Sequence, residues 1–139
     1  ESDATNADAL QLLGDALVAQ GDAVGAIAAY QRAVRLVPDF GEAYGGLVRA
    51  YELAGDVTGM GYARAMVAYS QGDYEQAIAE LQEVAGAWAE RAELHLGLAL
   101  AYERGGQVEQ ALEEYREALR LAPDSIAARR GVSKLTVNR

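Results

Sequence analysis

Apolar residues recur along this chain at helical spacing, in stretches that are separated by short polar turns. Leu10, Leu13 and Leu17 fall on one face of a helix, and a second apolar set follows after the next turn. Helix-breaking or turn-compatible residues lie at multiples of 17 positions from one another: Gly21, Pro38, Gly55, Gly72, Gly106 and Pro123, with Ala89 at the vacant step. This pattern predicts about eight helices and an all-α fold.

Start and stop signals agree with the predicted helices. Three pairs have the spacing of a capping box, in which the first side chain accepts a backbone N–H of the first turn: Thr5 with Asp8, Asp39 with Glu42, and Asp73 with Gln76. Three glycines sit where a left-handed residue commonly ends a helix: Gly21, Gly55 and Gly72. The expected helices are therefore bounded at both ends.

The apolar positions also repeat over a longer distance. The first set is Leu10, Leu13, Gly14, Leu17, Ala26, Tyr30, Ala33 and Pro38. Moved on by 85 residues, the same template reads His95, Leu98, Ala99, Tyr102, Ala111, Tyr115, Ala118 and Pro123. The pattern resembles the tetratricopeptide repeat, a 34-residue unit of two helices. The resemblance implies a right-handed α-solenoid of antiparallel helix pairs.

The expected organisation is a single domain over residues 1–139. It comprises a repeat at 7–40, an extended repeat at 41–91, a repeat at 92–125 and a capping helix at 126–137. The extended repeat is one and a half units long, and its extra half is the helix expected at 57–71. Gly59 and Gly61 weaken the start of that helix. They indicate either close packing in a decayed repeat or a hinge.

Composition restricts the classes of partner. The formal net charge is −9, which disfavours nucleic acid because phosphate binding depends on Lys and Arg. No apolar run reaches the roughly 20 residues that a membrane span needs. The absence of cysteine excludes disulfides and thiolate metal sites but leaves the cellular compartment open.

The sequence contains few residues that could form a catalytic site. The only histidine, His95, occupies a packing position of the template, and no serine has a matching base and acid. Glu113 and Glu114 are adjacent on a helix, so they cannot face one another. The chain is therefore expected to be no enzyme and to bind neither a metal nor another cofactor.

The resemblance implies instead a peptide-binding concave groove, lined by the first helix of each repeat. In this chain the groove candidates are Gln11, Asp15, Arg49, Glu52, Leu96, Leu100 and Glu103. The inserted helix contributes Ala63, Val67 and Ser70 if its register is shifted. If the register is not shifted, it contributes Tyr62, Met66 and Tyr69, which would otherwise be core residues.

The expected partner is a protein or peptide held in that groove, and acids kept near helix ends, such as Glu52 and Glu103, favour a basic one. One branch of the family binds the C-terminal carboxylates of chaperone peptides with Lys, Asn and Arg. The matching positions here hold Gln11, Asp15, Glu42, Gly46 and Gly97, so the sequence disfavours binding of that kind. A second hypothesis is self-association, in which stacks join end to end or exchange helices.

The final helix carries three cations, Arg129, Arg130 and Lys134. It is interpreted as a polar cap if Ile126, Val132 and Leu135 face the stack, and otherwise as a basic tail for an acidic partner.

Overall fold

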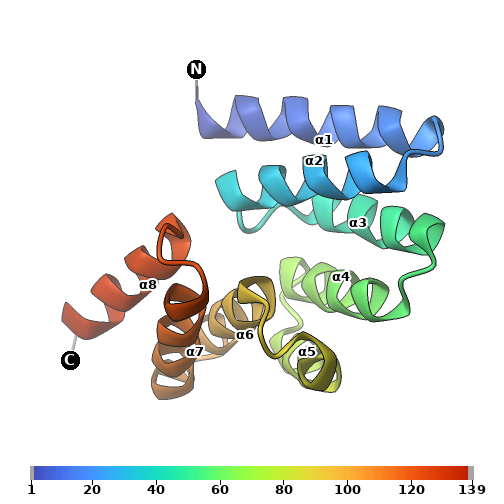
Figure 1. Cartoon of the computed structure of the whole chain (residues 1–139). Coiled ribbons are helices and arrows are strands. Elements are labelled where there is room, and N and C mark those ends of the chain that lie inside the picture. The colour runs from blue at the N-terminus through green and yellow to red at the C-terminus, as the bar shows by residue number, and fades with distance from the viewer. Residues whose placement is uncertain (1, 138–139) are drawn as a thin grey trace. The chain divides into compact units, whose positions relative to one another are not determined.

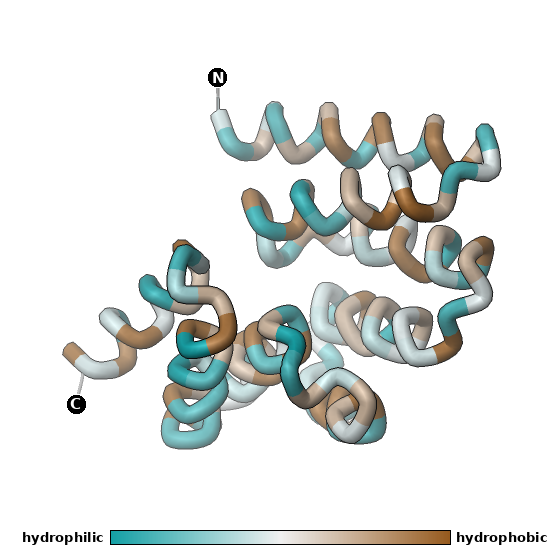
Figure 2. The backbone as a smooth tube through the Cα atoms, viewed as in Figure 1, coloured by the Kyte–Doolittle hydropathy of each residue, from teal (hydrophilic) through white to brown (hydrophobic). Residues whose placement is uncertain are grey.

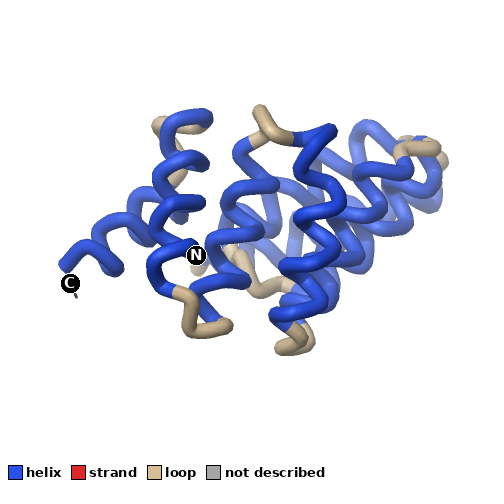
Figure 3. Tube along the Cα trace, turned by 90° about the horizontal axis from the view of Figure 1, so that it is seen from below, coloured by secondary structure: helices blue, strands red, loops and turns tan. Residues whose placement is uncertain are grey.

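A computed structural model describes residues 2–137 of the chain and contains eight α-helices and no strand in that range (Figures 1 and 3). The helices are α1 (Asp3–Ala19), α2 (Ala23–Leu36), α3 (Gly41–Ala54), α4 (Val57–Ser70), α5 (Tyr74–Trp88), α6 (Ala92–Arg104), α7 (Val108–Leu121) and α8 (Ile126–Val137). The all-α prediction is confirmed. Figure 2 shows apolar residues recurring at intervals along each helix, as expected for helices that bury one face.

The helix boundaries follow local chemistry at most turns. Gly21, Gly55 and Gly72 have φ angles of 81°, 73° and 86°, in the left-handed region, as predicted. Asp73 accepts a hydrogen bond from the backbone N–H of Gln76 and so begins α5 as expected. Asp22 caps α2 in the same way.

Two predicted caps are wrong. Helix α1 begins before Thr5, because the hydroxyl of Ser2 already accepts the N–H of Thr5. Helix α3 begins after Phe40 without a side-chain cap. The carboxylate of Asp39 instead accepts a hydrogen bond from the Tyr69 hydroxyl at 2.6 Å, because a buried tyrosine needs an acceptor.

The helices form two compact units, which meet in the chain between Gln71 and Gly72. In the first unit α1 packs on α2 and α3, α2 on α3, and α3 on α4. In the second unit α5 packs on α6, α6 on α7, and α7 on α8. The boundary therefore follows α4, the helix predicted to be an insertion; the insertion and the single domain over 1–139 both stay predictions.

Helix α4 is well packed within the first unit. Gly59 is buried, and a methyl group in its place would lie 2.3 Å from the Tyr51 ring, so this glycine allows α4 to approach α3 closely. The helix is ordered from Val57 onward, with Asp56 as its N-cap. Of the two predicted alternatives, close packing and a hinge, these contacts agree with close packing.

One tyrosine organises the core of each unit through contact with glycine. Tyr30 is fully buried, and its ring lies against Gly14 of α1 and Gly46 of α3. Tyr115 lies against Gly131 of α8 in the second unit. Because these glycines lack a side chain, each ring fits between neighbouring helices.

Candidate functional site

A polar cluster joins successive first helices of the first unit. The carboxylate of Asp15 on α1 accepts hydrogen bonds from the Tyr30 hydroxyl and, at 2.6 Å, from the side-chain amide of Gln11. Arg49 on α3 lies 3.5 Å from the same carboxylate. Three predicted groove residues, Gln11, Asp15 and Arg49, therefore lie together on the surface shared by α1 and α3.

Tyr30 holds the cluster in place from the interior of the first unit. Burial of the ring, followed by the hydrogen bond to Asp15 and its negative charge, raises the pKa of Tyr30 to about 12. The hydroxyl therefore stays protonated at neutral pH and keeps donating to Asp15. A rigid buried side chain thus fixes the position of a partly exposed acid.

The second unit contains an equivalent cluster around Glu103 of α6. Its carboxylate accepts a hydrogen bond from the Tyr115 hydroxyl at 2.6 Å and forms an ion pair with Lys134 of α8. Burial alone would raise the pKa of Glu103, but the hydrogen bonds from Lys134 and Tyr115 outweigh burial and lower the pKa below 4.5. Glu103 is therefore ionised at neutral pH.

The two clusters occupy matching places in the repeat pattern. Tyr115 follows Tyr30 by 85 residues, and Lys134 follows Arg49 by the same distance. Only the acid has moved: Leu100 stands where Asp15 would map, and Glu103 lies three residues further on, one helical turn along the same face. Each cluster ties two first helices to the second helix between them.

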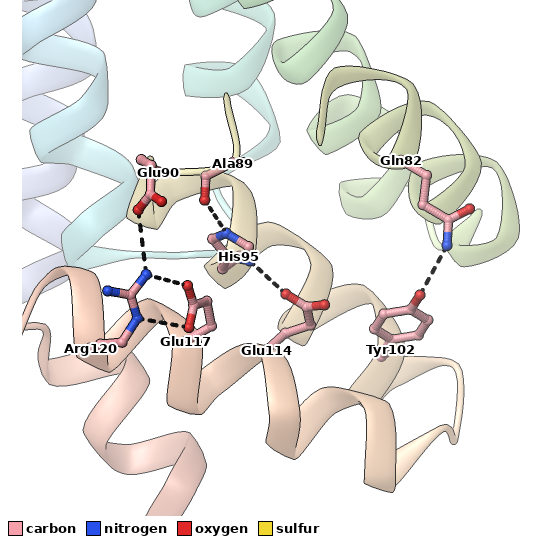
Figure 4. A network of polar contacts seen from close by, with 8 residues as sticks. All are labelled: Gln82, Ala89, Glu90, His95, Tyr102, Glu114, Glu117 and Arg120. Atoms are coloured by element: carbon pink, nitrogen blue, oxygen red, sulfur yellow. Dashed lines mark hydrogen bonds and ion pairs between the residues drawn. The ribbon is translucent and has the colours of Figure 1, made fainter. Parts of the chain in front are cut away.

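Polar contacts also surround His95 on α6 (Figure 4). Its Nδ1 lies 2.7 Å from a Glu114 oxygen, and its Nε2 lies 2.7 Å from the carbonyl oxygen of Ala89. Burial lowers the pKa of His95, but hydrogen bonding to Ala89 and Glu114 outweighs it and raises the pKa above 6.5. Because both neighbours are acceptors, the protonated ring satisfies both, as expected of a structural histidine.

Family models match two parts of the chain. One tetratricopeptide repeat model matches residues 14–55, and another matches residues 62–126. The chain belongs to the tetratricopeptide repeat family. This confirms the predicted family. A search of curated proteins finds no match.

Solved tetratricopeptide repeat domains share the fold at low sequence identity. The first such domain of human RPAP3 has a TM-score of 0.54 and 16% identity, over 95% of this chain and 91% of that one. MamA from Desulfovibrio magneticus RS-1 has a TM-score of 0.59 and 18% identity, over 96% and 85% of the two chains. The first domain of Spaghetti (RPAP3), bound to the HSP90 peptide SRMEEVD, has a TM-score of 0.55 and 16% identity, over 99% and 95%.

The expectation that Tyr62, Met66 and Tyr69 line a groove is wrong. These side chains are 4%, 0% and 2% exposed, so they belong to the core of the first unit. The physical reason is that α4 packs its aromatic face on α3, where large apolar side chains gain most from burial. Of the residues assigned to the shifted register, Ala63 is buried, while Val67 and Ser70 are half-buried.

The remaining groove candidates differ in accessibility. Glu52 is exposed on α3. Leu96 and Leu100 are half-buried, because they pack against the core cluster of the second unit that includes Leu112 and Tyr115. Each unit therefore presents a part of the predicted surface.

Helix α8 matches most of the expected cap. Leu135 is buried and Val132 is half-buried against the core of the second unit. Ile126, expected to face the stack as well, is 62% exposed. The condition for the cap interpretation therefore fails for Ile126, the first residue of α8, and is met by Val132 and Leu135.

The sequence analysis did not identify Tyr30 as a partner of Asp15, nor Tyr115 and Lys134 as partners of Glu103. The repeat offset carried a signal for them, since a cation stands 19 residues after each tyrosine, at the ninth position of the next first helix. Among the described residues, no group of acids and histidine is arranged to hold a metal ion. None of the helices in that range is long and apolar enough to cross a membrane.

Proposed function

We propose that this chain is a non-catalytic scaffold that holds a peptide or helix of a partner protein against its first helices, in the concave groove that the family resemblance implies. The observation that carries the proposal is the cluster of Gln11, Asp15 and Arg49. These residues come from two successive repeats, yet they share one surface and are fixed by the buried hydroxyl of Tyr30. A surface that is ordered before binding loses less entropy when a ligand docks.

The charge of this surface favours a basic partner segment. Helix α1 carries Asp3, Asp8 and Asp15 and no cation, and α3 adds Glu42 and Glu52 against the single cation Arg49. Opposite charges on a partner would speed association and fix its register. The HSP90 peptide bound by the Spaghetti domain is acidic, so a peptide of that type fits this surface poorly.

The proposal is tested by capture of partners followed by charge reversal. The immobilised chain is used to isolate binding proteins, and the affinity of each identified partner is then measured for wild type and for the double variant Glu42→Lys with Glu52→Lys. We expect the affinity to fall by about tenfold or more, which corresponds to roughly 1.4 kcal/mol.

A matched control carries the same charge change on second helices, namely Glu83→Lys with Glu113→Lys. Both control residues are exposed. Binding that is unchanged in the first double variant, or that is lost equally in the control, would contradict a binding surface on α1 and α3.

A further inference from the structure

Helix α1 exposes a face that the other first helices bury. This face consists of the third, sixth, seventh and tenth positions of each repeat, counted from residues 7, 41 and 92. In α3 these are Ala43, Gly46, Leu47 and Ala50, and in α6 they are Leu94, Gly97, Leu98 and Ala101; all eight are buried. In α1 they are Ala9, Leu12, Leu13 and Ala16, and all four are exposed.

The buried faces are covered by the helix that precedes them. Helix α2 packs on α3, α5 on α6, and α7 on α8. Within the described residues α1 has no such predecessor, so Leu12 is 63% exposed and Leu13 is 47% exposed. A contiguous apolar surface of this kind is typical of an interaction site.

The last helix offers a surface of opposite charge. Apart from Lys134 and Asp15, which take part in the polar clusters, α8 carries Arg129 and Arg130 and no acid, whereas α1 carries Asp3 and Asp8 and no cation. Ile126, Arg130 and Val137 follow one another at helical spacing on the exposed side of α8. This stripe combines apolar side chains with a cation, which complements the apolar face and acids of α1.

We propose that the exposed face of α1 in one molecule docks on the exposed stripe of α8 in a second copy, so that this protein assembles head to tail. Leu12 and Leu13 would meet Ile126 and Val137, while Asp8 would lie near the arginines of α8. This interaction shares Asp8 with the acidic surface that favours a basic partner, but it uses none of Gln11, Asp15 and Arg49 and neither of the residues changed in the partner-binding test, Glu42 and Glu52.

Two other modes of self-association fit the residues less well. Pairing α1 with α1 would bring the aspartates of both copies together. Exchange of α2 or α7 onto α1 would place a tyrosine against Leu12, at the position where α3 and α8 have Gly46 and Gly131. A methyl group at either glycine would already lie within 2.5 Å of the tyrosine ring. The stripe of α8 carries no aromatic residue, so it avoids that clash.

The contact uses different surfaces on the two copies, so a pair joined by one contact keeps one free surface at each end, and assemblies larger than a dimer form as the protein concentration rises. Light scattering of the full chain measures this. We expect the mass to rise from the 14.8 kDa of the monomer with concentration and to fall when salt screens the charges. A mass that stays at the monomer value over the whole concentration range would overturn the proposal.

Two variants, each lacking one of the two contact surfaces, test whether α1 of one copy binds α8 of another. Leu12→Asp removes the α1 surface and Arg130→Glu removes the α8 surface, and each alone is expected to be monomeric. An equal mixture of the two should give a dimer and nothing larger, because each variant keeps one intact surface. An α1-to-α1 pair would survive Arg130→Glu, and that result would overturn the proposal, as would a mixture that stays monomeric.

The controls make the same charge changes at other exposed positions. Leu53→Asp on α3 matches Leu12→Asp, and Arg32→Glu on α2 matches Arg130→Glu. Both controls should assemble like wild type. Circular dichroism of all four variants checks that the helices persist, and Leu13→Ser replaces Leu12→Asp if that variant loses helix content.

Discussion

The helix triplets α1–α2–α3 and α6–α7–α8 are built on the same plan with one acid displaced. Tyr30 and Tyr115 each place a ring against a glycine of the following first helix and donate a hydroxyl to an acid of the preceding one. In the first triplet the acid is Asp15, whose side chain is 38% exposed, and in the second it is Glu103, at 18%. The plan therefore tolerates a shift of one helical turn in the acid, but the tyrosine and the glycine keep their places.

The two triplets share their interior packing but differ in the polar contacts near the surface. The ring and the glycine meet in the interior, where a change of one methyl group is felt. The acid and the cation lie near the surface, where solvent compensates for a change of position. The strength of the expected effects follows this division.

The largest effect is expected for Gly46→Ala, compared with Gly131→Ala. The new methyl group would lie 2.3 Å from Cζ of Tyr30, which is fully buried and already confined by Gly14 on its other side. We expect a loss of about 3 kcal/mol in the free energy of unfolding. Denaturant unfolding of the full chain measures it.

Gly131→Ala should cost less, about 1–2 kcal/mol, because α8 is the last helix of the second unit and can shift away from Tyr115. An equal loss in the two variants would show that the triplets are equally tight and would contradict this difference.

The next effect concerns the tyrosine hydroxyls. Tyr115→Phe removes the hydroxyl that donates to the more buried carboxylate of Glu103 and leaves the ion pair with Lys134, and we expect a loss of about 1.5 kcal/mol. Tyr30→Phe should cost about 1 kcal/mol, since Asp15 keeps both Gln11 and Arg49. Hydrogen exchange of amides in the affected unit locates each loss; the reverse order of the two would refute the role of burial.

A pH dependence should distinguish the second triplet. His95 occupies the position of Leu10 in the first repeat. Because the folded pKa of His95 is raised above 6.5, its stabilising contribution is fully present below that pH and is lost as the pH rises through the raised pKa.

The second unit should therefore lose protection from hydrogen exchange toward alkaline pH, after correction for the intrinsic exchange rate. The effect should be smaller than that of Tyr115→Phe. His95→Leu, which copies the first repeat, should remove this dependence, and an NMR titration of the ring gives the pKa directly. A pKa at or below 6.5 would contradict the double hydrogen bond.

The smallest effects are expected from the cations. Arg49→Ala and Lys134→Ala each remove an exposed partner of a carboxylate, and we expect losses below about 1 kcal/mol that shrink further in salt. Lys134→Ala should have the larger effect, because Glu103 is less exposed than Asp15. Thermal unfolding at low and high salt measures both.

The sequence predicted the number of helices and their glycine-marked C-terminal ends well, because period, glycine and proline are local signals, whereas two of the three predicted N-terminal caps were wrong. Glycine at 21, 55 and 72 requires only the neighbouring turn to be interpreted. The burial of Tyr62, Met66 and Tyr69 was harder to predict from the sequence, since it depends on which face α4 turns toward α3. An apolar pattern with small residues on several sides does not fix that rotation.

The candidate site was predicted in part for a similar reason. The repeat template brought Gln11, Asp15 and Arg49 to one surface, because it encodes which positions neighbouring helices share. The acid of the second triplet moved by one turn, so its pairing with Tyr115 and Lys134 depended on side-chain reach rather than on spacing.

The position of each tyrosine between helices has a consequence for any attempt to shorten this chain. A cut after residue 40, where the first sequence repeat ends, would remove Gly46 and leave one side of the Tyr30 ring facing water. The smallest fragment that keeps this ring enclosed contains three helices and crosses the repeat boundary. The two-helix sequence repeat is therefore shorter than the three-helix packing unit that encloses the ring of Tyr30.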